Sequence, residues 1–151
     1  MDLRTFCEKD AAGAKQLILS ILAHEYPFDK SAYSDSDLEK IGEVYQGERN
    51  SFFVIEEDGV IVGTVGVKED SKDSALLRRL FVDSRYRKRG YGTALLKKAL
   101  EFCRSKSYKT ILFNGTGRMI DAMNLCKKIG FREVEQLEIS GFKIHRLTLQ
   151  L

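Results

Sequence analysis

The most informative part of this sequence reads Leu80-Phe81-Val82-Asp83-Ser84-Arg85-Tyr86-Arg87-Lys88-Arg89-Gly90-Tyr91-Gly92-Thr93. The pattern predicts a strand that ends near Val82, then a basic loop, then a helix that begins at Gly90. The first amides of a helix have no partner within it and carry the positive end of its dipole, so they favour an anion. Gly90 and Gly92 have no Cβ, which lets a phosphate approach the backbone closely. This stretch therefore predicts a site for a phosphate-bearing ligand.

Hydrophobic patterning on either side of this stretch predicts a mixture of strands and helices. The predicted strands are residues 51–55, 60–67, 75–82, 109–114, 131–139 and 142–149. The predicted helices are residues 11–22, 38–44, 90–105 and 119–129. We expect Asp10 to cap the first helix, Gly130 to end the last one, and Asp58-Gly59 and Ser140-Gly141 to form hairpin turns. This order of elements indicates a mixed α+β fold.

Length and composition favour one folded domain over residues 1–151. The chain is 43% hydrophobic and 31% charged, which excludes disordered and low-complexity classes. Its longest apolar run is far shorter than the roughly 20 residues that cross a bilayer, and residues 1–6 lack the pattern of a secretory signal. We therefore expect a cytoplasmic protein without a membrane partner. Three cysteines without metal-ligand spacing and two histidines predict no metal site.

The positive charge is concentrated in one segment. Residues 78–109 hold eleven basic and two acidic side chains, a charge of +9, whereas the rest of the chain carries −6. Five of these cations, from Lys97 to Lys109, suit the solvated face of a helix. The cluster over residues 85–89 fits an anionic ligand better. A nucleic acid is a weaker alternative, because only Tyr86 and Tyr91 are interleaved with the basic residues and no nucleic-acid-binding motif is present.

Two common phosphate-binding motifs do not fit this loop. A dinucleotide-binding fingerprint needs a third glycine near Leu95 and an acid after the next strand, where Asn114 stands. A Walker A loop needs Gly-Lys-Ser/Thr, but Thr93 and Ala94 follow Gly92.

The order Arg87-x-x-Gly90-x-Gly92 after a strand, followed by Gly130-Phe131 after a second helix, resembles the GNAT family of acyl-CoA N-acyltransferases. Residues 77–82 and 127–131 are similar to the family's strand before the loop and to its distal motif. The resemblance implies the GNAT fold, a central, mostly antiparallel mixed sheet flanked by helices. It also implies an enzyme that uses acetyl-CoA as co-substrate, without a metal, and acetylates a primary amine by direct attack in a ternary complex.

The resemblance assigns the cofactor contacts as well. Two neighbouring parallel strands, which end near Val82 and Asn114, are expected to separate and admit the pantetheine arm, while loop amides hold the pyrophosphate. The cofactor-binding residues implied are Leu80, Phe81, Val82, Arg87, Lys88, Arg89, Gly90, Tyr91, Gly92, Thr93 and Asn114.

The catalytic positions depart from the family's pattern. Leu76 stands where the family often has a carboxylate base, Met119 where it often has asparagine, and Cys126 where it often has tyrosine. Cys126 is therefore a candidate acid, with core packing as the expected alternative. The candidate bases are Glu25, His24, Asp73 and His145, and a water relay is a further alternative. These departures keep open a second function, a CoA-binding regulatory module with little turnover.

The acceptor side is less defined. The resemblance places it between the first helices and the last strands, and we expect a small-molecule or peptide amine. Three aromatic residues could form a wall, namely Tyr26, Phe28 and Tyr33. Four acids could favour a cationic amine or merely cap helices, namely Glu25, Asp29, Asp35 and Asp37. Whichever of Arg78 and Arg79 points into the cleft could bind a carboxylate of the acceptor. Exposed edge strands would allow a homodimer.

Overall fold

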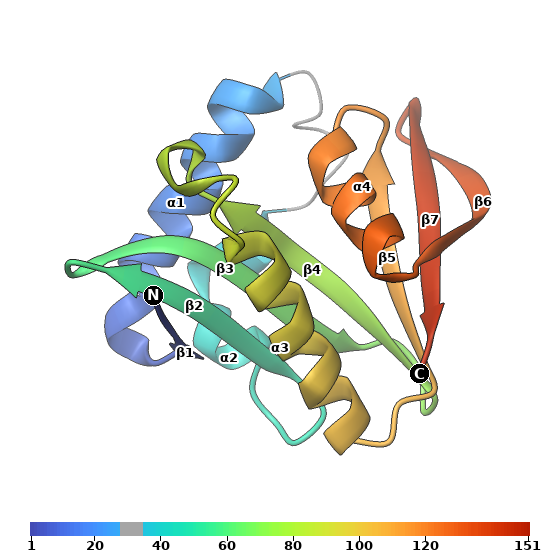
Figure 1. Cartoon of the computed structure of the whole chain (residues 1–151), viewed down its shortest axis with the longest axis horizontal. Coiled ribbons are helices and arrows are strands. Elements are labelled where there is room, and N and C mark those ends of the chain that lie inside the picture. The colour runs from blue at the N-terminus through green and yellow to red at the C-terminus, as the bar shows by residue number, and fades with distance from the viewer. Residues whose placement is uncertain (28–34) are drawn as a thin grey trace.

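A computed structural model of the chain describes residues 1–27 and 35–151 (Figure 1). The strands are β1 (Asp2–Thr5), β2 (Ser51–Glu57), β3 (Val60–Glu69), β4 (Ser74–Val82), β5 (Thr110–Thr116), β6 (Arg132–Ile139) and β7 (Phe142–Gln150). The α-helices are α1 (Ala11–Glu25), α2 (Ile41–Val44), α3 (Tyr91–Ser105) and α4 (Ile120–Ile129). Short 3₁₀ turns are η1 (Glu8–Asp10), η3 (Ser36–Glu39) and η4 (Ser84–Tyr86).

The strands form one sheet in the order β1-β2-β3-β4-β5-β7-β6, in which only β4 and β5 run parallel to each other. Helices cover both faces. On one face α3 and α4 pack on a core that includes Val65, Leu96 and Cys126, and on the other α1 and α2 pack on Val54 and Phe81. Figure 1 shows α3 and α4 in front of the sheet and α1 behind it. The predicted mixed α+β class with a mostly antiparallel sheet is confirmed.

The parallel strands β4 and β5 pair over only part of their length. Their register begins at Ser74 and Thr110 and ends at Leu77 and Phe113, although β4 continues to Val82 and β5 to Thr116. Beyond that point the backbone groups of β4 that face β5 have no strand partner there. The sheet therefore opens at its centre, beside the loop that joins β4 to α3.

A β-bulge lies in β4 at this opening. Arg78 pairs with Gly66 and Phe81 pairs with Thr64, so two residues of β4 oppose the single residue Val65 of β3. Arg79 adopts a left-handed backbone with φ 55°, and its carbonyl accepts a hydrogen bond from Thr64 Oγ1 at 2.8 Å. A bulge breaks the alternation of side chains along a strand. As a result, the neighbours Arg78 and Arg79 both reach Asp37 of η3.

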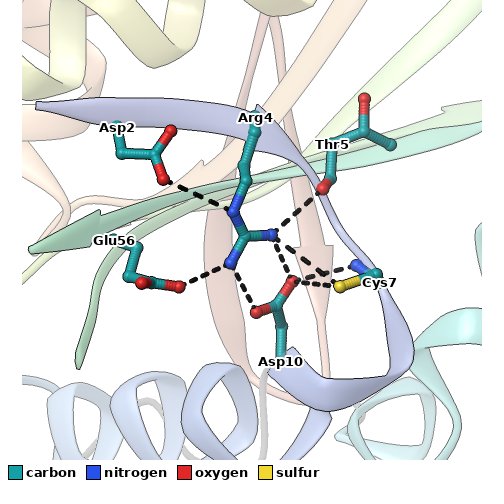
Figure 2. A network of polar contacts seen from close by, with 6 residues as sticks. All are labelled: Asp2, Arg4, Thr5, Cys7, Asp10 and Glu56. Carbon is teal, nitrogen blue, oxygen red and sulfur yellow. Dashed lines mark hydrogen bonds and ion pairs between the residues drawn. The ribbon is translucent and has the colours of Figure 1, made fainter. Parts of the chain in front are cut away.

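The amino-terminal strand β1 is an element that hydrophobic patterning missed. It is short, with two charged residues among its four, and pairs with the edge of β2. Figure 2 shows how Arg4 fastens it: its guanidinium reaches Asp10 at 2.7 and 2.8 Å and Glu56 at 2.6 Å. Asp10 occupies the N-cap position of α1, as predicted, but its side chain makes no capping hydrogen bond there. Its buried carboxylate instead accepts hydrogen bonds from Arg4 and, at 2.9 Å, from the backbone amide of Cys7.

Candidate active site

A cavity of about 250 Å³ lies where β4 and β5 separate. Its walls come from α1, β4, β5, the start of α4 and the β6–β7 hairpin, and most are apolar: Leu22, Leu76, Phe81, Met119, Ile139 and Ile144. The polar side chains among the described residues that line it are Arg78, Arg79 and Asn114. None of the four candidate bases lines the cavity, namely Glu25, His24, Asp73 and His145.

Arg79 is held by a buried counter-ion. Its Nε and Nη2 donate to the Asp37 carboxylate at 3.1 and 2.6 Å, and Tyr45 donates its hydroxyl to the same carboxylate at 2.8 Å. Burial alone would raise the pKa of Asp37, but the hydrogen bonds and charge of Arg79 outweigh it and hold that pKa below its ordinary value. Asp37 is therefore an internal partner of Arg79, and neither a helix cap nor a group that faces a cationic amine.

A glycine makes room for this buried group. A Cβ on Gly66 would lie 2.8 Å from Tyr45 Cε1 and 3.1 Å from Phe52, so only glycine lets the Tyr45 ring pack against β3. That packing places the Tyr45 hydroxyl within hydrogen-bond distance of the Asp37 carboxylate. Sequence patterning missed this arrangement, because Asp37, Tyr45, Gly66 and Arg79 belong to four separate parts of the chain, η3, the end of α2, β3 and β4.

The loop between β4 and α3 has the backbone shape of an anion cradle. Lys88 and Gly90 adopt left-handed conformations, with φ 60° and 84°, and Gly90 is the N-cap of α3. Alternation of left-handed residues just before a helix turns successive amides toward one point. A Cβ on Gly90 would meet nothing within 4 Å, so the space above the loop is open. The predicted helix start at Gly90 is confirmed to within one residue, since α3 begins at Tyr91.

Gly92 has a different reason to be glycine. A Cβ there would lie 3.0 Å from Leu125 Cδ2 of α4. The missing side chain thus lets α3 and α4 approach each other. Close approach of a phosphate therefore explains the glycine at position 90 better than the glycine at position 92.

Half of the basic cluster at residues 85–89 is neutralised within the chain. Arg85 pairs with Asp83 at 2.9 Å. Arg87 pairs with Glu25 at 2.6 Å and donates from Nε to the Val82 carbonyl at 2.9 Å. By contrast, Lys88 and Arg89 have no ion-pair partner among residues 1–27 and 35–151. The Arg89 guanidinium lies over the Tyr86 ring. These two cations are the ones available to a ligand at the loop.

Comparisons with known proteins now bear on this geometry. A family model described as the acetyltransferase (GNAT) family matches residues 16–131, which include the loop, both glycines and α4. The chain belongs to the GNAT family. It is 31% identical over 121 residues to a probable N-acetyltransferase camello of Xenopus tropicalis, a match that covers 78% of this chain and 55% of that protein. It is 34% identical over 105 residues to the N-acetylaspartate synthetase of the same species, covering 68% and 39%. The chain thus spans about half the length of these curated relatives, or less.

Solved structures show the same GNAT fold. An acetyltransferase of Staphylococcus aureus Mu50 superposes with a TM-score of 0.86 at 22% identity, covering 99% of this chain and 98% of that one. A putative acetyltransferase of Salmonella typhimurium, determined with its cofactor acetyl-CoA, superposes with a TM-score of 0.82 at 18% identity, covering 99% and 93%. Among the described residues of the present GNAT chain, no helix is long and apolar enough to cross a membrane.

The candidate bases of this GNAT protein are occupied elsewhere. Glu25 is bound to Arg87, and His24 Nδ1 lies 2.8 Å from the Ser20 carbonyl within α1. Asp73 lies before β4, at the end of the strand opposite the loop, near Lys109. His145 Nδ1 lies 2.8 Å from Glu133 on the β6–β7 hairpin. The structure thus brings Glu25 to the rim of the loop, and brings none of the four into the cavity.

The three positions that depart from the GNAT pattern separate in space. Leu76 and Met119 line the cavity, whereas Cys126 of α4 is fully buried in the core. Burial raises the pKa of the Cys126 thiol to about 12, which makes it a poor proton donor at neutral pH. Asn114 does line the cavity, and its Oδ1 accepts a hydrogen bond from Arg146 Nε at 3.1 Å.

The predicted acceptor wall is only partly described. Phe28, Asp29 and Tyr33 lie outside the described residues. Asp35 is exposed and makes no capping hydrogen bond at the start of η3. The walls that the structure does describe are mostly apolar and come from α1, β4, β5, the start of α4 and the β6–β7 hairpin. Hydrophobic patterning could assign these apolar residues only to the core.

Proposed function

We propose that this GNAT protein transfers the acetyl group of acetyl-CoA to the primary amine of a small molecule or peptide, in a ternary complex. The observation that carries the proposal is the opening between β4 and β5, which leads from the Gly90 loop to the cavity. The open space at Gly90 and the unpaired cations Lys88 and Arg89 fit a pyrophosphate. The β4 edge beyond Leu77 fits the pantetheine amides as a strand partner.

Acetyl-CoA supplies the activated acetyl thioester. The residues Leu80, Phe81 and Val82 would flank its arm along β4, and the amides of residues 88–93 would hold its phosphates. The Val82 carbonyl already accepts from Arg87, so that arm would compete with an internal hydrogen bond there. The acceptor nitrogen then forms a bond to the acetyl carbon, the carbon–sulfur bond breaks, and the nitrogen's proton is lost to solvent as the CoA thiolate leaves.

The described cavity favours the neutral form of the acceptor amine, so that no side chain of the protein has to act as a base. Its walls are largely apolar, and its charged lining residues are Arg78 and Arg79. Apolar surroundings and nearby positive charge both disfavour an ammonium ion. The acceptor amine can therefore lose its proton on entry, by way of water, and attack directly.

The phosphate site can be tested by removing its two unpaired cations. We expect the Lys88→Met, Arg89→Met double variant to bind acetyl-CoA about 10-fold or more weakly, because it loses charge-assisted contacts to the pyrophosphate. S-acetylpantetheine, which lacks the pyrophosphate, should bind wild type and variant alike. Lys97→Met, at an exposed position of α3, is the matched control. Equal acetyl-CoA affinity in the folded double variant would refute the assignment of this loop.

Turnover separates the enzyme from the alternative function, a CoA-binding regulatory module. That alternative is consistent with Leu76 standing where the family often has a carboxylate base. Release of free CoA with an amine panel, measured with a thiol reagent, is expected of the enzyme. Tight binding of acetyl-CoA without release of CoA by any amine would favour the module.

A further inference from the structure

Two guanidinium groups, Arg78 and Arg79, line the cavity, and they differ in how closely they are paired. Arg79 is buried against Asp37, whereas Arg78 reaches the same carboxylate only at 3.8 Å and lies beside walls that are mostly aliphatic. An unpaired charge next to an apolar surface is costly, so such a site favours a ligand that brings the opposite charge.

Arg78 is the loosely paired member of the two. Asp37 is committed to Arg79 and Tyr45 through hydrogen bonds of 2.6 to 3.1 Å. Arg78 Nη2 approaches the same carboxylate only to 3.8 Å, beyond hydrogen-bond distance, and its side chain remains 29% exposed. Among residues 1–27 and 35–151, Arg78 has no other carboxylate within ion-pair distance.

Arg78 stands where an acceptor must sit. It directly follows Leu77, the last residue of β4 that pairs with β5, so it lies at the point where the sheet opens. A group bound by Arg78 would hold the acceptor in the opening, within reach of a thioester lying along β4. This position suits a carboxylate close to the reacting amine.

The remaining walls specify what accompanies the carboxylate. Leu22, Phe81, Met119, Ile139 and Ile144 surround a volume of about 250 Å³, slightly below the usual range of ligand pockets, which begins at about 300 Å³. The volume suits a molecule of amino-acid size.

We infer that the acceptor is an amine with a single carboxylate and an apolar body, such as an aliphatic amino acid, and that Arg78 binds that carboxylate. The inference rests on the proposed acetyl transfer and deepens it. A dicarboxylate such as aspartate would place its second negative charge against aliphatic walls. The cavity therefore favours leucine over aspartate, although one relative is an N-acetylaspartate synthetase.

The test compares acceptors that differ in one group. Initial rates of CoA release are measured with L-leucine, with 3-methylbutylamine, which is leucine without its carboxylate, and with L-aspartate. A charge-assisted hydrogen bond is worth about 10- to 150-fold in kcat/KM, and we expect leucine to exceed 3-methylbutylamine by that factor. Aspartate should fall below leucine. Calorimetric binding of leucine to the CoA-loaded protein provides a second readout.

Arg78→Met should abolish the preference for leucine over 3-methylbutylamine by raising KM for leucine alone, and Arg78→Lys should restore part of it. Arg104→Met, an exposed change on α3 away from the cavity, is the control and should keep the preference. The inference is overturned if wild type uses the two amines equally, if it binds and acetylates only amines without a carboxylate, or if Arg78→Met keeps the preference. Failure to bind acetyl-CoA would instead refute the proposed function.

Discussion

Asp37→Asn tests whether the buried pair beside the cavity stabilises the fold. Asp37 and Arg79 side chains are each 5% exposed, and the carboxylate accepts two hydrogen bonds from Arg79 and one from Tyr45. Asparagine removes the negative charge and places an amide donor where Arg79 or Tyr45 already donates. The buried Arg79 guanidinium then loses its ion pair with Asp37.

The size of the effect follows from that geometry. Removing one member of a buried ion pair costs about 3 to 5 kcal/mol of unfolding free energy. In a chain of 151 residues, each kcal/mol lowers Tm by about 2 to 4 °C, so the expected fall is roughly 6 to 20 °C. Urea denaturation followed by circular dichroism measures the free energy, and calorimetry measures Tm.

Two further variants make the result specific. Asp35→Asn, an exposed neighbour without a capping hydrogen bond, should change stability by less than about 0.5 kcal/mol. Arg79→Met in the Asp37→Asn background should recover part of the loss, because it removes the buried charge that Asp37 no longer balances, and a coupling of about 1 to 3 kcal/mol is expected. If Asp37→Asn is no less stable than Asp35→Asn, the pair does not hold this part of the fold.

Two other substitutions test the amino-terminal network and the core cysteine. The hydrogen bonds and charge of Arg4 lower the pKa of Asp10 from 3.8 to about 2, so the ionised carboxylate stabilises the fold above pH 3.8 and that stability is lost as the pH falls toward 2. Asp10→Asn should therefore be less stable at neutral pH, and its unfolding free energy, measured by urea denaturation, should fall less steeply than that of wild type as the pH drops below about 4. An equally steep fall in both proteins would contradict this. Cys126→Ala should cost about 1 kcal/mol of stability and leave turnover per folded molecule unchanged, because the thiol is buried in the core. A tenfold loss of turnover at unchanged Tm would show that the thiol acts as an acid instead.

Much of this protein could be predicted from local sequence. Both expected hairpin turns form with positive φ at consecutive residues, 50° and 80° at Asp58 and Gly59, 51° and 81° at Ser140 and Gly141. Gly130 ends α4 with φ 125°. Turns, caps and amphipathic periods depend on residues a few positions apart, so their physics is contained in a short window of sequence.

The partners of the charged side chains were decided only by the tertiary structure. Sequence alone made Asp37 either a helix cap or an acid facing a cationic amine, Glu25 a candidate base, and residues 85–89 a single basic patch. In the folded chain Asp37 meets Arg79 across 42 positions and Glu25 meets Arg87 across 62. Carboxylates are chemically alike, and which cation each one finds depends on how distant elements pack. The bulge in β4, which turns Arg78 and Arg79 to one acid and leaves Arg78 only loosely paired, has no local signal either, because it is a mismatch between two strands.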